Sequence, residues 1–165
     1  MAAMQLQVRF TAISNSHHRV EMERPDGTLE SAELETRSCL LHDIVHFAVE
    51  TKAQLRDAFF GRIAAGATYE SLAAASMPAD PVDELGWTER VVGPLQGWLQ
   101  RPTRSSAAEF VATLQSYQSS LGMPCPSWLT EELVDHVREQ VTQLQGHWRG
   151  TPHGETMALT FTLTD

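Results

Sequence analysis

Two alternating apolar segments, one at each end of the chain, restrict most strongly how this sequence can fold. From Met4 to Phe10, apolar residues take every second position and polar residues fill the positions between them. From Met157 to Leu163, apolar residues again alternate, here with an alanine and two threonines. A period of two is typical of a strand that buries one face. Both strands need a sheet, so the two ends of the chain are predicted to pair in one antiparallel sheet.

A turn near residue 26 predicts that the N-terminal strand belongs to a hairpin. Val20 and Met22 stand between polar neighbours and continue the period of two, which indicates a second strand. Residues 25–27 read Pro-Asp-Gly and supply the turn, with glycine available for a positive φ. Residues 28–36 are expected to return as a weaker third strand, because their apolar residues do not keep one phase.

Between these strands, apolar residues recur at intervals of three and four, which is typical of amphipathic helices. The first helix is expected to begin at Ser38, a suitable N-cap residue. Its predicted apolar stripe consists of Leu41, Ile44, Val45, Ala48, Leu55 and Phe59. Gly61 and Gly66 offer stopping points after it.

The later helices are indicated by their ends. Residues 80–81 read Asp-Pro, a cap followed by proline at the first helical position. The stripe of that helix would hold Trp87, Val91, Leu95 and Trp98. Residues 93–94 read Gly-Pro and are expected to break or kink it. Residues 106–109 form a capping box for the next helix, which residues 122–124 close, and a last apolar stripe covers residues 129–148.

These patterns predict a single α+β domain over residues 1–165. A chain of 165 residues that is 42% hydrophobic can bury one continuous core. The predicted architecture is an antiparallel sheet made of the N-terminal hairpin strands and the C-terminal strand, packed against a block of about four to five helices.

The charge of the chain limits its partners. Its 21 acidic and 12 basic residues give a formal charge of −9, which repels phosphate backbones and anionic membrane surfaces. We therefore expect neither nucleic acid nor a membrane as partner. Cys39 and Cys125 are too few and too far apart for a disulfide framework, and the opening residues do not resemble a secretory signal. A cytoplasmic location is predicted.

One motif carries specific chemistry: residues 42–46 read His-Asp-Ile-Val-His. On a helix, His42 and His46 lie one turn apart on the same face and can share a metal ion. Zinc commonly takes histidine nitrogen, and a catalytic site needs a third protein ligand and an open position for water. The pattern resembles the zincin motif H-E-x-x-H over five residues, with Asp43 in the place of the glutamate that serves as general base.

The departure from that motif matters, because aspartate is one methylene shorter than glutamate and reaches less far toward a metal-bound water. Glu50 continues the four-residue spacing, but eight residues along a helix span about 12 Å, too far for it to share an ion with His42. Glu50 is instead expected to orient a histidine from behind the ligands.

The surrounding segment has a second resemblance. Residues 41–50, which include His42, Asp43, His46 and Glu50, are similar to a segment of uncharacterised bacterial proteins that contain H-D-L-x-H-x-x-V-E. The similarity covers about ten residues. It implies a bacterial source and a recurring helix, and no reaction.

A solvated helix face is the alternative explanation. Chance would supply about 0.04 histidine pairs with an acid in second place, given the seven histidines of the chain. At 100° per residue, His42, His46, Glu50 and Asp57 cluster opposite the predicted stripe, so that face is equally consistent with exposure to water. If it is covered instead, a third ligand is required. The candidates for it are His17, His18, His136, His147, His153 and Glu84.

Other features have less specific meanings. Glu132 and His136 lie one turn apart, which is more often a surface pair than a metal site. Cys39 precedes the histidine helix and is either an activated thiolate or, more commonly, a structural cysteine. Trp87 and Trp98 would form either core or an exposed patch for a partner.

Two hypotheses follow. The first is a divalent-metal protein of the bacterial cytoplasm that binds zinc through His42 and His46. It would be a minimal or degenerate zincin-like hydrolase with Asp43 near the metal-bound water, and zinc is the only cofactor suggested. The alternative is a non-catalytic interaction or assembly module, with a solvated His/Asp/Glu helix face, that binds a protein partner or a second copy of itself.

Overall fold

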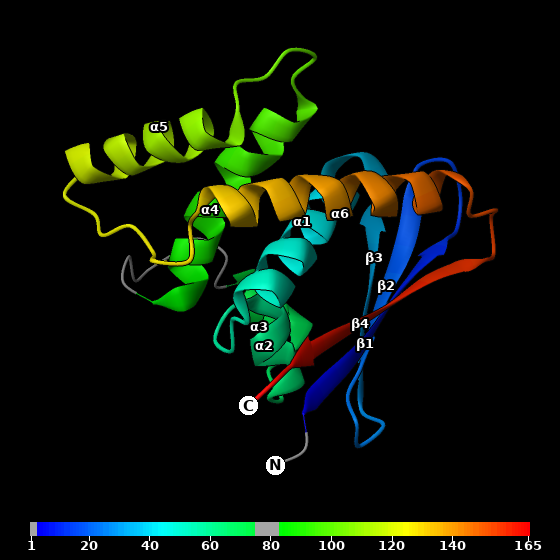
Figure 1. The fold of residues 1–165 in the computed structure, drawn as a ribbon. Helices are drawn as coiled ribbons and strands as arrows, with labels where there is room; N and C mark the ends of the chain where they lie inside the picture. Colours follow the sequence, from blue (N-terminus) through cyan, green and yellow to red (C-terminus); the bar gives the residue numbers. More distant parts are fainter. Residues whose placement is uncertain (1–2, 75–82) are drawn as a thin grey trace.

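The computed structural model describes residues 3–74 and 83–165. Its strands form one antiparallel sheet, as predicted, and their order is β3-β2-β1-β4. The strands are β1 (Met4–Ala12), β2 (His17–Glu23), β3 (Leu29–Glu35) and β4 (Thr156–Leu163). Figure 1 shows β1 and β4, from opposite ends of the chain, side by side in the sheet.

The register of the sheet explains the alternation in the sequence. Phe10 pairs with Met157 on β4 and with Val20 on β2, and all three side chains are buried. The polar residues between them point to the other face, where Arg9 forms an ion pair with Glu23 at 2.9 Å. The period of two therefore puts one face of the sheet into the core, which confirms the prediction for both ends of the chain.

The third strand, β3, is the weak one. It lies at the edge of the sheet and has no fully buried residue. Leu29 is 45% exposed and Leu34 is half-buried. The apolar residues of β3 thus do not alternate regularly because the strand lies at the edge of the sheet.

Six helices lie in the described residues, slightly more than the sequence predicted. They are α1 (Thr36–Ala53), α2 (Phe59–Ala64), α3 (Tyr69–Ala74), α4 (Glu84–Gln100), α5 (Ala107–Ser120) and α6 (Glu131–Arg149). Helix α1 packs against the sheet and also against α4 and α6, as Figure 1 shows. Seven consecutive positions, residues 44–50, are buried along its middle, because α1 is covered on more than one side.

The limits of α1 differ from the prediction. The helix begins at Thr36 with Glu35 as N-cap, and the hydroxyl of Ser38 instead donates a hydrogen bond to the Glu35 carboxylate at 2.9 Å. It ends at Ala53, because Gln54 adopts a left-handed conformation with φ of 56°. Phe59 therefore belongs to α2 and not to the stripe of α1.

A glycine within α2 was expected to stop a helix but instead permits a close approach. A Cβ atom on Gly61 would collide with the carbonyl oxygens of Leu55 and Arg56. Gly66 follows α2 with φ of 111°, which agrees with its predicted role as a stopping point.

Helix α4 runs through the predicted break. Pro94 lies inside the helix, and both Gly93 and Pro94 are exposed. The predicted start at residues 80–81 lies outside the described residues. The N-cap of α4 is Asp83, whose side chain accepts a hydrogen bond from Gly86 N at 2.7 Å.

The last two helices follow the sequence closely. Ser106 caps α5 by accepting a hydrogen bond from Glu109 N at 3.2 Å, and Gly122 follows the helix with φ of 68°. Thr130 caps α6, where Leu133 N donates to its hydroxyl at 3.2 Å. Within the described residues, no helix combines the length and the apolar character needed to cross a lipid bilayer.

Candidate metal centre

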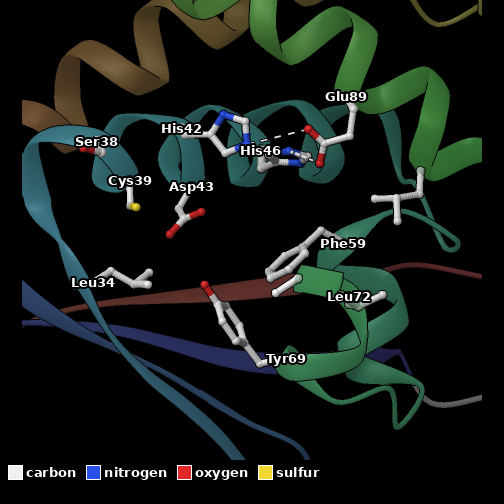
Figure 2. Close-up of a pocket in the computed structure, with 12 residues that line it drawn as sticks. Leu34, Ser38, Cys39, His42, Asp43, His46, Phe59, Tyr69, Leu72 and Glu89 are labelled. Atoms are coloured by element: carbon white, nitrogen blue, oxygen red, sulfur yellow. Dashed lines mark ion pairs between the residues drawn. The ribbon is translucent and has the colours of Figure 1, made fainter. Parts of the chain in front are cut away.

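Three side chains from two helices converge at the middle of the molecule. His42 and His46 lie one turn apart on α1, and Glu89 reaches them from α4 (Figure 2). One ligand atom from each residue lies within 4.8 Å of the other two. The group is close enough to hold a metal ion.

The distances within this group are near those of a coordinated ion. His46 Nε2 lies 2.9 Å from Glu89 Oε1, and His42 Nε2 lies 3.7 Å from Glu89 Oε2. In a tetrahedral zinc site with bonds of about 2.0–2.1 Å, neighbouring ligand atoms are about 3.3 Å apart. Small side-chain rotations would therefore be enough to bring the three residues to a common ion.

Glu50 orients His46 from behind. His46 Nδ1–H donates to Glu50 Oε2 at 3.0 Å, so Nε2 faces Glu89. The other oxygen of Glu50 accepts the backbone N–H of Phe60 at 2.8 Å. A carboxylate behind a histidine is the usual support of a metal-binding imidazole, and Glu50 makes the corresponding hydrogen bond to His46.

Gln96 orients His42 in the same way. Its Oε1 lies 3.1 Å from His42 Nδ1 and accepts the proton on that nitrogen. The lone pair of His42 Nε2 then points toward the carboxylate of Glu89, so two hydrogen-bond acceptors face each other. A cation between them would satisfy both.

Without a metal, His46 is an ion-pair centre. Burial by itself would lower the pKa of His46, but its hydrogen bonds to Glu50 and Glu89 outweigh burial and raise the pKa to about 10. Burial tends to raise the pKa of Glu89, yet the hydrogen bond from His46 leaves it below its usual value. Burial lowers the pKa of His42, with the neighbouring His46 charge adding to the effect. Without a metal, His46 thus lies between Glu89, whose pKa is lowered, and Glu50, whose pKa is raised by burial.

Asp43 lies on the cavity side of α1. Figure 2 shows its carboxylate pointing into a cavity below the helix. Burial raises its pKa to about 7, the nearby His46 charge partly opposes this, and Glu89 adds a smaller upward effect. A carboxyl group with a pKa near neutrality can exchange protons at physiological pH.

The cavity has a volume of about 230 Å³ and reaches the metal centre, because His42, His46 and Glu89 are part of its wall. Tyr69, the first residue of α3, stands across from Asp43. The remaining described residues that line it are Leu34, Ser38, Cys39, Phe59, Leu72, Ala73 and Leu85.

The solvated-face interpretation of α1 is wrong. His46 is 3% exposed and Glu50 is fully buried, because α4 and the Phe60 backbone cover that side of the helix. His42 and Asp43 are half-buried. Asp57, which was expected on the same face, lies beyond the end of α1.

The third member of the group is none of the predicted candidates. His17, His136, His147 and His153 are exposed, His18 is buried elsewhere beside Thr36, and Glu84 bonds the backbone N–H of Asp57. Sequence reasoning missed Glu89 because it considered only the stripe with Val91, Leu95 and Trp98, which is buried, whereas α4 also buries a neighbouring face. Leu85, Glu89, Val92 and Gln96 lie on one helix face, and an acid on a face that also holds buried leucine and valine was the available signal.

The other candidates lose their functional interpretations. The pKa of Cys39 is raised by burial and by the charges of Asp43 and Glu35, so its thiolate is disfavoured. Trp98 is 2% exposed and Trp87 is half-buried, so they form no exposed tryptophan patch. Glu132 pairs with Lys52 at 3.4 Å.

The fold and the site together define an α+β protein with a two-histidine, one-carboxylate group spaced for a metal ion. No model of a protein family, no curated protein and no solved structure matches this chain.

Proposed function

We propose that this protein binds zinc through His42, His46 and Glu89. The proposal rests mainly on one observation: His42 Nε2 faces the Glu89 carboxylate at a distance of 3.7 Å. Gln96 accepts the proton of the other ring nitrogen, Nδ1, so Nε2 has none. Two acceptors in this arrangement repel each other unless a proton or a cation lies between them. His46, oriented by Glu50, supplies the third ligand.

The ligand set favours zinc among the common metals. Two histidines and a carboxylate serve catalytic zinc in proteins, where a fourth position stays open for water. The same set also suits ferrous iron, so elemental analysis has to identify the metal. Calcium and magnesium prefer sites made of oxygen ligands alone.

We further propose a hydrolytic reaction in the adjoining cavity, in the manner of a minimal zincin. A bound zinc ion would act as a Lewis acid and make water acidic near neutral pH. Asp43 points into the same cavity and is our candidate to accept the proton of the attacking water. Asp43 here has the role that glutamate has in the H-E-x-x-H motif.

The metal proposal is tested by elemental analysis of tag-free protein. We expect one zinc per chain in the wild type and less than a tenth of that in a His42→Ala, His46→Ala double variant and in Glu89→Ala. The matched control is a His147→Ala, His153→Ala double variant, because both histidines are exposed and outside the group. The control should keep its zinc.

Equal, sub-stoichiometric metal in all four proteins would refute zinc binding. The cluster would then be a buried ion-pair network, with His46 held between Glu50 and Glu89 at 3.0 and 2.9 Å. That result would favour the second candidate function, a non-catalytic interaction or assembly module.

The hydrolytic proposal needs a separate variant. Asp43→Asn should retain zinc but lower kcat for ester or amide hydrolysis by about 100-fold or more, the usual contribution of a general base. Asp135→Asn is the control, since Asp135 forms an ion pair with Arg138 away from the cavity. Loss of zinc in Asp43→Asn would instead assign Asp43 to metal binding.

We also propose that the protein acts in the bacterial cytoplasm. Both cysteines are free, which suits a reducing compartment. The bacterial source rests on the resemblance of residues 41–50 alone.

A further inference from the structure

The cavity beside the metal centre has an apolar wall. Leu34 of β3, Phe59 of α2, Leu72 of α3 and Leu85 of α4 contribute to it. These residues come from four elements and lie around one space, as Figure 2 shows for Leu34, Phe59 and Leu72. A ligand in this space would bury an apolar group against them.

Away from the metal ligands, the described lining of the cavity also lacks a counter-charge for an anion. Among the described residues that line it, the ionised or ionisable groups are acids, histidines, a thiol and a phenol, and there is no lysine or arginine. Asp43 and Glu89 both add negative charge to it. A carboxylate or phosphate on a ligand would therefore be desolvated without a partner at any place away from the metal.

The size of the cavity sets a limit on the ligand. Its volume is about 230 Å³. Drug-sized ligands occupy pockets of about 300–1,000 Å³. A short acyl group fits this space, and several residues of a polypeptide do not.

Tyr69 provides a fixed hydrogen-bond donor in this space. Its hydroxyl points into the cavity toward Asp43, and its ring packs edge-on against Phe59 with 6.0 Å between ring centroids. Its backbone N–H donates to Glu30 at 2.8 Å, and Glu30 is in turn paired with Arg24 at 3.4 Å. Because these contacts anchor Tyr69, its hydroxyl can meet a ligand carbonyl with little loss of entropy.

We propose that the substrate is a small uncharged amide or ester with a short apolar acyl group, whose carbonyl oxygen accepts a hydrogen bond from Tyr69. This rests on the proposed zinc hydrolase. In the reaction, water adds to the acyl carbon and the bond from that carbon to nitrogen or oxygen breaks. Asp43 takes one proton from the water and returns it to the leaving group, and the products are a carboxylic acid and an amine or alcohol.

The test uses two hydroxamates of equal size and different charge. 4-Methylpentanohydroxamate ends in an isopropyl group, and succinic monohydroxamate has a carboxylate in its place. Both chelate zinc through the same group, so a difference in their affinities reports on the cavity. We expect the isopropyl compound to bind the zinc-loaded full chain at least tenfold more tightly, as measured by calorimetry.

Matched variants test whether the preference for the isopropyl compound arises in the cavity. Leu34→Arg puts a cation on the cavity wall and should reduce the preference to about equality or reverse it. Leu29→Arg introduces the same charge on the same strand at a position 45% exposed and outside the cavity lining, and it should leave the preference unchanged. Tyr69→Phe should weaken binding of the isopropyl compound by about fivefold, the usual effect of one hydrogen bond. Thermal melts confirm that each variant is folded.

The outcomes separate this proposal from the one on which it rests. Stoichiometric zinc with equal affinities, or with tighter binding of the carboxylate compound, would overturn the substrate class and leave the metal site intact. Cleavage of unfolded casein by the zinc-loaded chain would also overturn it. Absence of zinc binding would refute the proposed function, and the substrate class with it.

Discussion

Glu50 accepts a hydrogen bond from His46, one turn earlier on α1, at a distance of 3.0 Å between Oε2 and Nδ1, and both side chains are buried. The second oxygen of Glu50 accepts from Phe60 N at 2.8 Å. Each carboxylate oxygen thus serves a different donor. The proposed metal ligand is tied by this one side chain to the backbone at the start of α2.

Replacing Glu50 with glutamine tests that double role. An amide has one acceptor oxygen, so Glu50→Gln would leave either His46 Nδ1–H or Phe60 N–H facing a donor. We expect zinc affinity to fall by about 10- to 100-fold, measured by competition with a chromogenic chelator. Glu132→Gln is the control, because Glu132 is exposed and pairs only with Lys52 among the described residues. Unchanged affinity in Glu50→Gln would contradict a supporting role.

The two histidines should differ in their effect on stability when no metal is present. His46→Ala leaves Glu50 and Glu89 without the cation between them, which should cost about 3–5 kcal/mol of unfolding free energy. His42 is half-buried and lies 3.7 Å from Glu89, so His42→Ala should cost about 1 kcal/mol. Urea denaturation in the presence of a chelator measures both. Similar losses in the two variants would argue against the buried ion pair.

Gln96 should matter for metal binding and not for stability. Gln96→Ala removes the acceptor that holds the His42 ring, so zinc affinity should fall by about tenfold with little change in melting temperature. Gln100→Ala offers a matched control, since Gln100 lies one turn further along α4 and is exposed. If both variants bind zinc like the wild type, Gln96 does not position His42.

The parts of the fold that the sequence predicted are those set by local patterns. The period of two in β1 and β4 reflects burial of one sheet face, and it can be recognised from the order of apolar and polar residues within each strand. Capping by Ser106 is equally local, because hydroxyl and backbone N–H are three residues apart. The helix is not broken at Pro94, since whether a helix tolerates proline depends on exposure of that turn in the folded protein.

The candidate site could be predicted only in part for a related reason. The spacing of His42 and His46 fixes their common helix face, and the spacing of Glu50 places it one turn on. Glu89 lies on a different helix, and only the packing of α4 against α1 brings it to His46. The spacing of residues within one helix therefore cannot predict that contact between two helices.

His18 gives a pH-dependent stability that is independent of the metal centre. Its ring is fully buried between Phe10 and Trp148, and among the described residues its Nε2 has no hydrogen-bond partner. Burial, with a smaller effect of His17, lowers its pKa from 6.5 to about 4.

Between pH 6.5 and 4 the unfolded chain therefore binds a proton at His18 that the folded protein does not. This contribution is fully present above pH 6.5 and is lost as the pH falls toward 4, by about 3 kcal/mol in all. We expect the unfolding free energy of the wild type, relative to His18→Phe, to decrease over that interval in urea titrations at pH 7.5, 6, 5 and about 4. The other shifted groups titrate in both proteins, so the difference isolates His18. If the difference in unfolding free energy between the two proteins does not change with pH, His18 becomes protonated in the folded protein as it does in the unfolded chain. Its buried Nε2 would then need a hydrogen-bond acceptor, which the packing around Phe10 and Trp148 does not provide.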